Sequence, residues 1–197
     1  MPNWCDNTLN IQGPADTLKN LWDEANKTGL LNAMVPMPKE LEGTTSPTPK
    51  GSKQPKVDGF DNWYDWRIAN WGCKWDVDME GLQYIDYGDG TATIEGWFAS
   101  PWAPPTNAYD TFLDDTDNCS LESFYEEGGH DYAGHYDNGS DDCIVGIEDY
   151  ARKVVRGGAS GSSLYDFLDG ELGLTKYWRN YIEDDQAHIQ AMERSNV

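Results

Sequence analysis

Two histidines within an acidic run are the first residues whose types suit metal binding or acid–base chemistry. His130 and His135 lie five positions apart in "EEGGHDYAGHYDNGSDD", and on a strand this spacing sends their side chains to opposite faces. It also differs from the i, i+4 spacing of a helical zinc pair. The carboxylates of residues 137–142 lack the closing Glu of an EF-hand calcium loop. The pattern favours a solvated, charged turn and predicts no metal site and no cofactor.

Tryptophans form a second candidate site. Four of the nine tryptophans lie in "DNWYDWRIANWGCKWD", residues 61–76, where they either line a core or offer flat faces to a base or sugar. Helical spacing gathers Trp63 and Trp71 on one side and leaves Trp66 offset and partly exposed. Stacking on nucleic acid favours neighbouring Lys and Arg, and this segment holds only two basic residues. Core use is therefore favoured, and aromatic ligand binding is kept as the alternative, with the rings of Trp66, Trp71, Trp75 and Trp102.

Charge is the third chemical feature, and it is unevenly distributed. The formal net charge is −21, and residues 75–151 hold 19 Asp and Glu but no Lys or Arg. Such a surface repels phosphate, so direct nucleic-acid binding is not expected. It attracts a cation or a basic protein surface instead. The candidate binding residues are Asp110, Asp114, Asp115, Asp117, Glu122, Glu126, Glu127, Asp131, Asp137, Asp141 and Asp142.

These features leave two classes of function. The first is a protein-interaction module whose acids engage a basic surface on a host protein, with DNA mimicry as its sharpest version. A plainer explanation of the acidity is that it keeps the protein soluble and monomeric. The second class is a small-ligand- or cation-binding enzyme that uses the Trp-rich face with the carboxylates of residues 126–142. The sequence shows no nucleophile motif, phosphate loop or dinucleotide fingerprint, so the first class is favoured over an enzyme.

The elements that position these residues follow from apolar periodicity and from Gly and Pro. The alternation of apolar and polar residues predicts a strand over residues 3–13 and hairpins over residues 82–98 and 119–139. Apolar spacing predicts helices over residues 14–29, 60–71 and 105–115. This order predicts an α+β fold in which helices cover one face of an antiparallel sheet.

The chain is predicted to form one domain with an appended extension. The domain covers residues 1–145 and includes a mobile loop at 43–59, which is rich in Pro, Ser, Thr, Gly and Lys. Residues 146–197 are expected to be helical and to dock on the same chain, or on a second copy, which leaves a monomer or a weak homo-oligomer. The four cysteines lack metal-binding spacing and are expected to be buried thiols in a reducing cytosol. No apolar run predicts a membrane span or a secretory signal.

Four segments, in this order, resemble a known family: "MPNWCDNTLNIQG" at the start, "NWGCKWD" at 70–76, "WFASPWAPP" at 97–105 and "FYEEGGHDYAG" at 124–134. They resemble the phage- and plasmid-encoded proteins that carry a YubB-type ferredoxin-like domain, over roughly residues 1–137. Cys73 stands where the family commonly has Thr, and residues 99–105 replace a Thr-Ala-Trp-Ser-Pro-Pro-like run.

The resemblance implies a ferredoxin-like α+β topology, which does not entail an iron–sulfur cluster, and a phage or mobile-element origin. It supplies no reaction, and no catalytic residue is carried over from it. Together with the charge, it gives the expectation of a small acidic accessory protein in the host cell cytoplasm, whose partner is a host protein with a basic surface.

Overall fold

A computed structural model describes residues 3–146 of the chain. The chain divides into two compact units, one holding residues 1–129 and 135–141, the other holding residues 130–134 and 142–197. The second unit is thus described only at residues 130–134 and 142–146. The predicted helical extension over residues 146–197 lies outside the described residues, apart from Gly146.

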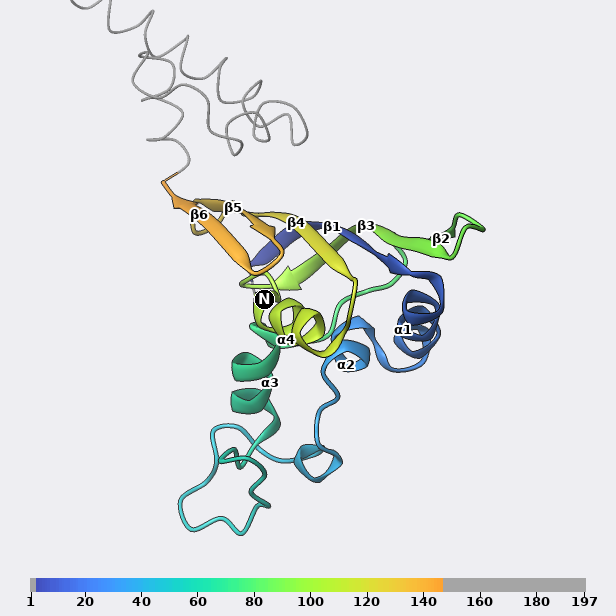
Figure 1. Cartoon of the computed structure of the whole chain (residues 1–197). Coiled ribbons are helices and arrows are strands. Elements are labelled where there is room, and N and C mark those ends of the chain that lie inside the picture. Colours follow the sequence, from blue (N-terminus) through green and yellow to red (C-terminus); the bar gives the residue numbers. More distant parts are fainter. Residues whose placement is uncertain (1–2, 147–197) are drawn as a thin grey trace, which may run out of the picture. The chain divides into compact units, whose positions relative to one another are not determined.

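The sheet has six strands in the order β2-β3-β1-β4-β5-β6 (Figure 1). These strands are β1 (Trp4–Pro14), β2 (Leu82–Asp86), β3 (Thr91–Pro101), β4 (Ser120–Glu127), β5 (Tyr132–Asp137) and β6 (Ser140–Val145). β1 is antiparallel to β3 and β4, and β2 is antiparallel to β3. With α1 (Ala15–Thr28) after β1 and α4 (Thr106–Asp115) after β3, the first four strands form the βαββαβ arrangement of ferredoxin-like folds. The predicted fold class is confirmed.

The helices lie on one face of the sheet, beneath it in Figure 1. α1 buries Leu18, Leu21 and Ala25 at helical spacing and ends at Gly29, whose φ of 97° suits glycine. This confirms the predicted helix over 14–29. A short α2 (Leu30–Met34) and the 3-10 turn η1 (Lys39–Leu41) follow, and neither was expected. None of the described helices is long and apolar enough to cross a membrane.

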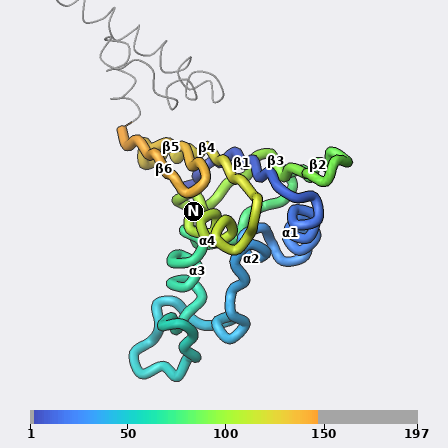
Figure 2. The backbone as a smooth tube through the Cα atoms, viewed as in Figure 1, coloured from blue at the N-terminus to red at the C-terminus, as the bar shows by residue number. Residues whose placement is uncertain are grey.

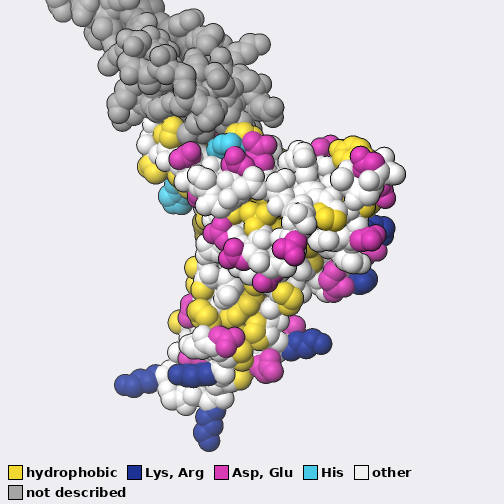
Figure 3. Space-filling view, viewed as in Figure 1, with side chains coloured by type: hydrophobic (Ala, Val, Ile, Leu, Met, Phe, Trp, Pro, Cys, Tyr) yellow, Lys and Arg dark blue, Asp and Glu magenta, His cyan; other side chains and the backbone are white. Residues whose placement is uncertain are grey.

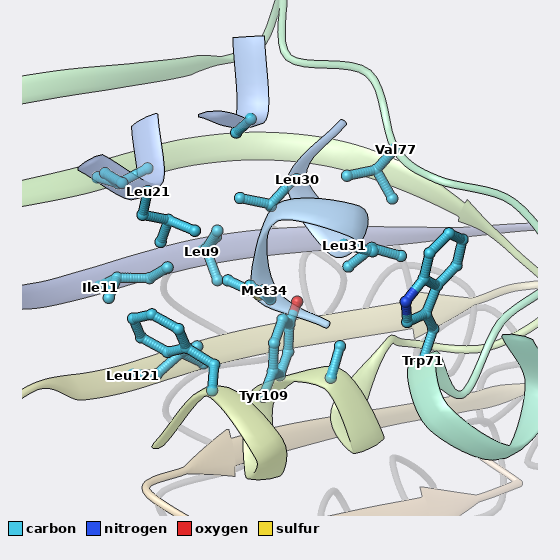
Figure 4. Packing of buried hydrophobic residues seen from close by; sticks show 14 of the residues in the cluster. Leu9, Ile11, Leu21, Leu30, Leu31, Met34, Trp71, Val77, Tyr109 and Leu121 are labelled. Atoms are coloured by element: carbon cyan, nitrogen blue, oxygen red, sulfur yellow. The ribbon is translucent and has the colours of Figure 1, made fainter. Parts of the chain in front are cut away.

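The core lies between the helices and the sheet. Along β1, alternate residues from Cys5 to Ile11 are buried, because side chains of a strand alternate between its two faces. Figure 4 shows Leu9 and Ile11 facing the residues of α2 and Tyr109 of α4. Trp4 lies on the opposite face of the sheet and is 50% exposed.

The helix α3 (Trp63–Trp71) begins three residues later than predicted, because the side chain of Asn62 accepts a hydrogen bond from the Asp65 N–H and caps it. Trp66 and Trp71 are 4% and 1% exposed, and their rings meet edge to face at 5.9 Å. The expectation that Trp66 is partly exposed is wrong. The helix is covered on more than one side, so a single apolar stripe does not describe it.

Residues 43–59 form an irregular loop between η1 and α3 (Figure 2). The side chain of Gln54 bridges its two ends: it accepts from the Thr45 N–H and donates to the carbonyl oxygens of Thr45 and Asp61. The absence of a long helix or strand in this segment agrees with the prediction of a loop, and its mobility remains a prediction.

Two of the four cysteines meet the expectation of burial. Cys5 and Cys73 are buried, and burial raises the pKa of the Cys73 thiol to about 12. Cys119 is half-buried and Cys143, in the second unit, is exposed. The expectation was therefore wrong for Cys143.

Candidate functional site

The sheet face opposite the helices, called the open face, carries two tryptophans on its central strands. In the antiparallel register of β1 and β3, Asp6 lies opposite Ala99 and Thr8 opposite Trp97. Because side chains alternate along each strand, Trp4, Asp6 and Trp97 share the open face. Trp4 is 50% exposed and Trp97 51% exposed. Two half-exposed indoles on paired strands are well placed to contact a ligand.

These indoles border a hollow of about 570 Å³. Asp6 contributes a carboxylate from β1, and Asp78 and Glu80 contribute two from the segment between α3 and β2. None of the described residues that line it is a Lys or Arg. We name this site the acidic hollow and define it by Trp4, Asp6, Asp78, Glu80 and Trp97.

Asp76 anchors the segment that forms one wall of the acidic hollow. Its Oδ1 accepts hydrogen bonds from the N–H groups of Leu31 at 2.9 Å and Val77 at 2.8 Å, and its Oδ2 accepts from the N–H of Asn32 at 2.9 Å. Burial raises the pKa of Asp76, while these backbone hydrogen bonds and the Arg67 charge act against that rise. Asp76 also borders the hollow, but its oxygens are engaged in holding the first turn of α2.

Two glycines let the same segment approach β3 closely. The Trp97 N–H donates to the Gly81 carbonyl oxygen at 3.0 Å. A Cβ on Gly81 would collide with the carbonyl oxygen of Trp97, and one on Gly96 would collide with that of Gly81. Gly96 also has a φ of +142°, which side chains rarely allow. The wall of the acidic hollow therefore depends on the lack of side chains at these two positions.

Asp6 of the acidic hollow faces a second acidic residue on the open face. Asp6 lies directly opposite Glu126 in the pairing of β1 with β4. Burial raises the pKa of Asp6, and burial together with the Asp6 charge raises the pKa of Glu126. A positive charge placed near the pair would stabilise both carboxylates in their ionised form.

A stack of tryptophans adjoins the acidic hollow at Trp4. The Trp75 ring centroid lies 6.5 Å from that of Trp4 and 6.5 Å from that of Trp102. The Lys74 ammonium lies 4.3 Å from the Trp75 centroid, 5.3 Å from Trp102 and 5.8 Å from Tyr64. The chain thus holds one of its own cations by cation–π contact with this stack.

The four tryptophans predicted as the alternative, aromatic binding site differ in their exposure: two are buried and two are partly exposed. Trp66 and Trp71 belong to the core and cannot contact a ligand, which corrects their assignment. Trp75 and Trp102 are each 36% exposed and lie together in the stack.

Sequence reasoning missed the two indoles of the acidic hollow, although strand alternation is a signal for both. The strand alternation that places Ile94 and Phe98 toward the helices places Trp97 on the open face. No sequence pattern predicts that Asp78 and Glu80 lie beside Trp97, because their position depends on the close approach of Gly81 to β3.

The predicted acidic residues do not gather on one face of the sheet. Those of α4 and its following turn are Asp110, whose carboxylate accepts from the Tyr136 hydroxyl at 2.6 Å, and the exposed Asp114, Asp115 and Asp117. α4 lies on the helix side. Glu122 and Glu126 alternate with the buried Leu121, Ser123 and Tyr125 and so lie on the open face. In Figure 3 the acids on the visible side are scattered and do not merge into one patch.

The other predicted acidic residues differ in burial and in their hydrogen-bond partners. Glu127 is buried, and its carboxylate accepts from the Gly129 N–H at 2.7 Å. Asp137 is exposed, and Asp141 accepts from the Tyr125 hydroxyl at 2.5 Å. Asp131 and Asp142 belong to the second unit. Of all the predicted acids, Glu126 is the one paired directly with a residue of the acidic hollow.

The two histidines belong to different units of the chain. The ring of His135 stacks on Phe124 with centroids 4.1 Å apart, and its Nε2 lies 2.9 Å from Glu122 Oε1. His130 belongs to the second unit. Within residues 3–146, no group of three or more His, Cys, Asp or Glu side chains is arranged to hold a metal ion.

No protein-family model matches the chain. No curated protein matches it significantly. Among solved structures, a protein api92 from Yersinia pseudotuberculosis, described with the family model DUF1281, aligns with a TM-score of 0.31 and 19% sequence identity. The alignment covers 45% of this chain and 32% of that protein. A similarity this low assigns neither a fold nor a function, so the geometry of the chain has to carry the proposal.

Proposed function

We propose that the chain is an interaction module that binds a partner protein through a basic surface on that partner. The observation that carries the proposal is the acidic hollow, in which three carboxylates and two half-exposed indoles meet on the open face. Carboxylates attract a positive charge, and indole faces stabilise one by cation–π contact. The resemblance to phage- and plasmid-encoded proteins suggests that the partner is a host protein in the host cytoplasm.

The distribution of acids favours local recognition over a long acidic track. DNA mimicry needs carboxylates in a row along one surface, whereas the acids of α4 and those of β4 lie on opposite sides of the sheet. The proposal therefore places the specific contact at the acidic hollow. The other exposed acids increase the rate of encounter with a basic partner, and this contribution decreases as salt is added.

Affinity capture from host-cell lysate with the full-length chain tests this function. Asp78→Asn with Glu80→Gln removes two charges from the acidic hollow, and Asp114→Asn with Asp115→Asn removes two from exposed positions on α4. The wild-type and α4 variant should retain the same basic proteins at low salt and release them at high salt, and the hollow variant should retain much less. Equal capture by both variants would place the contact elsewhere, and a lack of any retained basic protein would contradict the function.

A small organic cation is the second candidate ligand. The volume of about 570 Å³ lies within the range of small-molecule sites, about 300–1,000 Å³. Native mass spectrometry of the purified chain tests this candidate. A bound cation that is lost in the Asp78→Asn, Glu80→Gln variant would support it, and an unliganded mass in both proteins, combined with capture of a basic protein, would favour the interaction module.

A further inference from the structure

We infer that the acidic hollow binds one arginine side chain of the partner. The inference rests on the proposed function, because it names the group on the partner that the site recognises. It follows from the combination of flat aromatic walls and carboxylates around one hollow, and it does not depend on the total negative charge of the chain.

The guanidinium group fits this combination better than an ammonium. It is planar, it carries five N–H donors, and it is more weakly hydrated, so it stacks on an aromatic face while donating hydrogen bonds to carboxylates at its edge. Trp4 and Trp97 line the hollow and can offer such faces, and Asp6, Asp78 and Glu80 line it and can accept hydrogen bonds. A lysine ammonium would use the same faces but has no planar edge for two parallel hydrogen bonds.

The chain contains a local precedent for a guanidinium among indoles. The guanidinium carbon of Arg67 lies 5.2 Å from the Trp63 ring centroid and 4.6 Å from that of Trp71. Lys74 occupies the neighbouring stack formed with Trp75 and Trp102. Each of these aromatic groups already contacts a cation of the chain, whereas none of the described residues that line the acidic hollow is basic.

A bound cation also removes an unfavourable interaction on the open face. Asp6 and Glu126 oppose each other with like charges, an arrangement that destabilises paired strands. A guanidinium next to Asp6 would offset that repulsion. A neutral ligand such as a sugar would stack on the indoles but would leave the repulsion in place.

Titration of the full-length chain with N-acetyl-arginine amide, followed by the indole N–H signals in NMR spectra, tests this inference. The signals are assigned with Trp4→Phe and Trp97→Phe. Arginine amide should shift the signals of both indoles in a saturable manner, with a dissociation constant on the order of millimolar for a single side chain. N-acetyl-citrulline amide, the neutral analogue, should shift neither, and N-acetyl-lysine amide should bind several-fold more weakly. Equal responses to arginine and citrulline, or to arginine and lysine, would overturn the inference.

Substitutions locate the binding. Trp97→Ala should weaken arginine binding by about two- to fivefold, the loss expected for one exposed cation–π contact. Tyr87→Ala removes an aromatic side chain that is 58% exposed and is not part of the acidic hollow, and it should leave the affinity unchanged. A thermal melt of each variant confirms that it folds.

The outcomes separate this inference from the proposed function. If arginine amide leaves the Trp97 signal unmoved while hollow-dependent capture of a basic protein persists, the choice of arginine is wrong and the function stands. If arginine amide binds but no basic protein is captured from lysate, the site recognises guanidinium and the interaction function is contradicted.

Discussion

At the scale of single residues, the carboxylates of Asp6 and Glu126 are a pair of like charges on the open face. They are directly opposed across β1 and β4, and both have a raised pKa because of partial burial. Each carboxylate is therefore less stable in its ionised form in the folded chain than in the unfolded chain. In the proposed function, such a pair lowers the stability of the free protein, and a bound cation would offset that loss.

Replacing Glu126 by Gln should stabilise the free protein at neutral pH. The substitution removes the like charge opposite Asp6, which we expect to raise the free energy of unfolding by roughly 0.2–1 kcal/mol. Urea unfolding at pH 7 measures the change. Asp114→Asn, at an exposed position on α4, serves as the control and should change it little. A variant less stable than the wild type would show that Glu126 makes a favourable contact instead.

The same pair sets a direction for the dependence on pH. Because the folded-state pKa of each carboxyl is raised, protonation of Asp6 and Glu126 favours the folded chain. Their contribution to the free energy of unfolding is therefore greatest below the unfolded-state pKa of about 4. It decreases as the pH rises through the raised values. Glu126→Gln should therefore lose less stability than the wild type between about pH 4 and pH 7. Parallel curves for the two proteins would contradict this assignment.

The sequence named acids and tryptophans as candidate binding residues, whereas the acidic hollow is lined by other members of both residue types. The predicted acids and the aromatic alternative include Glu126 and Trp75, which lie next to residues of the acidic hollow, and Trp102, which stacks on Trp75. The prediction missed Trp97, whose exposure follows from strand alternation, and included Trp66, whose burial follows from contacts on several sides of α3.

At the scale of elements, the segment from residue 76 to residue 81 links the sheet to the helix layer. Asp76 holds the first turn of α2 at one end, and Gly81 lies against β3 at the other. Neither contact is local in sequence, so local patterns could predict α1, α4 and the hairpins but not the path of this segment. The five-residue α2 was missed for the same reason, because a distant carboxylate caps it.

Asp76→Ala should destabilise the protein strongly for a single substitution. It leaves three backbone N–H groups without their acceptor, and the loss is roughly 1–3 kcal/mol. A shift of the urea midpoint measures it, and Asp78→Asn, which keeps a side-chain oxygen for the Glu80 N–H, should shift it much less. Equal midpoints for Asp76→Ala and wild type would contradict the anchoring role.

Gly81→Ala tests the close approach on which the acidic hollow depends. The added methyl group would collide with the Trp97 carbonyl oxygen, so we expect a loss of roughly 1–3 kcal/mol from overpacking. Gly128→Ala is the matched control, because the nearest atom to its Cβ would be 4.0 Å away. Melting of both variants at the wild-type temperature would contradict the close approach of Gly81 to β3.

At the scale of the whole molecule, the net charge of −21 destabilises the compact state through self-repulsion. Sodium chloride screens exposed charges, with a Debye length of about 10 Å at 0.1 M. The melting temperature should therefore rise between low salt and 0.5 M salt, by roughly 2–4 °C for each kcal/mol of repulsion removed. Differential scanning calorimetry measures the rise. A melting temperature that falls with salt would mean that attractive ion pairs outweigh the repulsion.

The carboxylate of Asp76 connects the acidic hollow with backbone amides of α2, so binding in the hollow should affect those amides. It joins one wall of the acidic hollow to amide groups of α2, which lies in the layer on the other side of the sheet. A side chain held by Asp78 and Glu80 would restrain that wall, and the Leu31 and Asn32 amide protons would then exchange with solvent more slowly. Hydrogen exchange at these two amides would therefore report binding of the proposed arginine side chain.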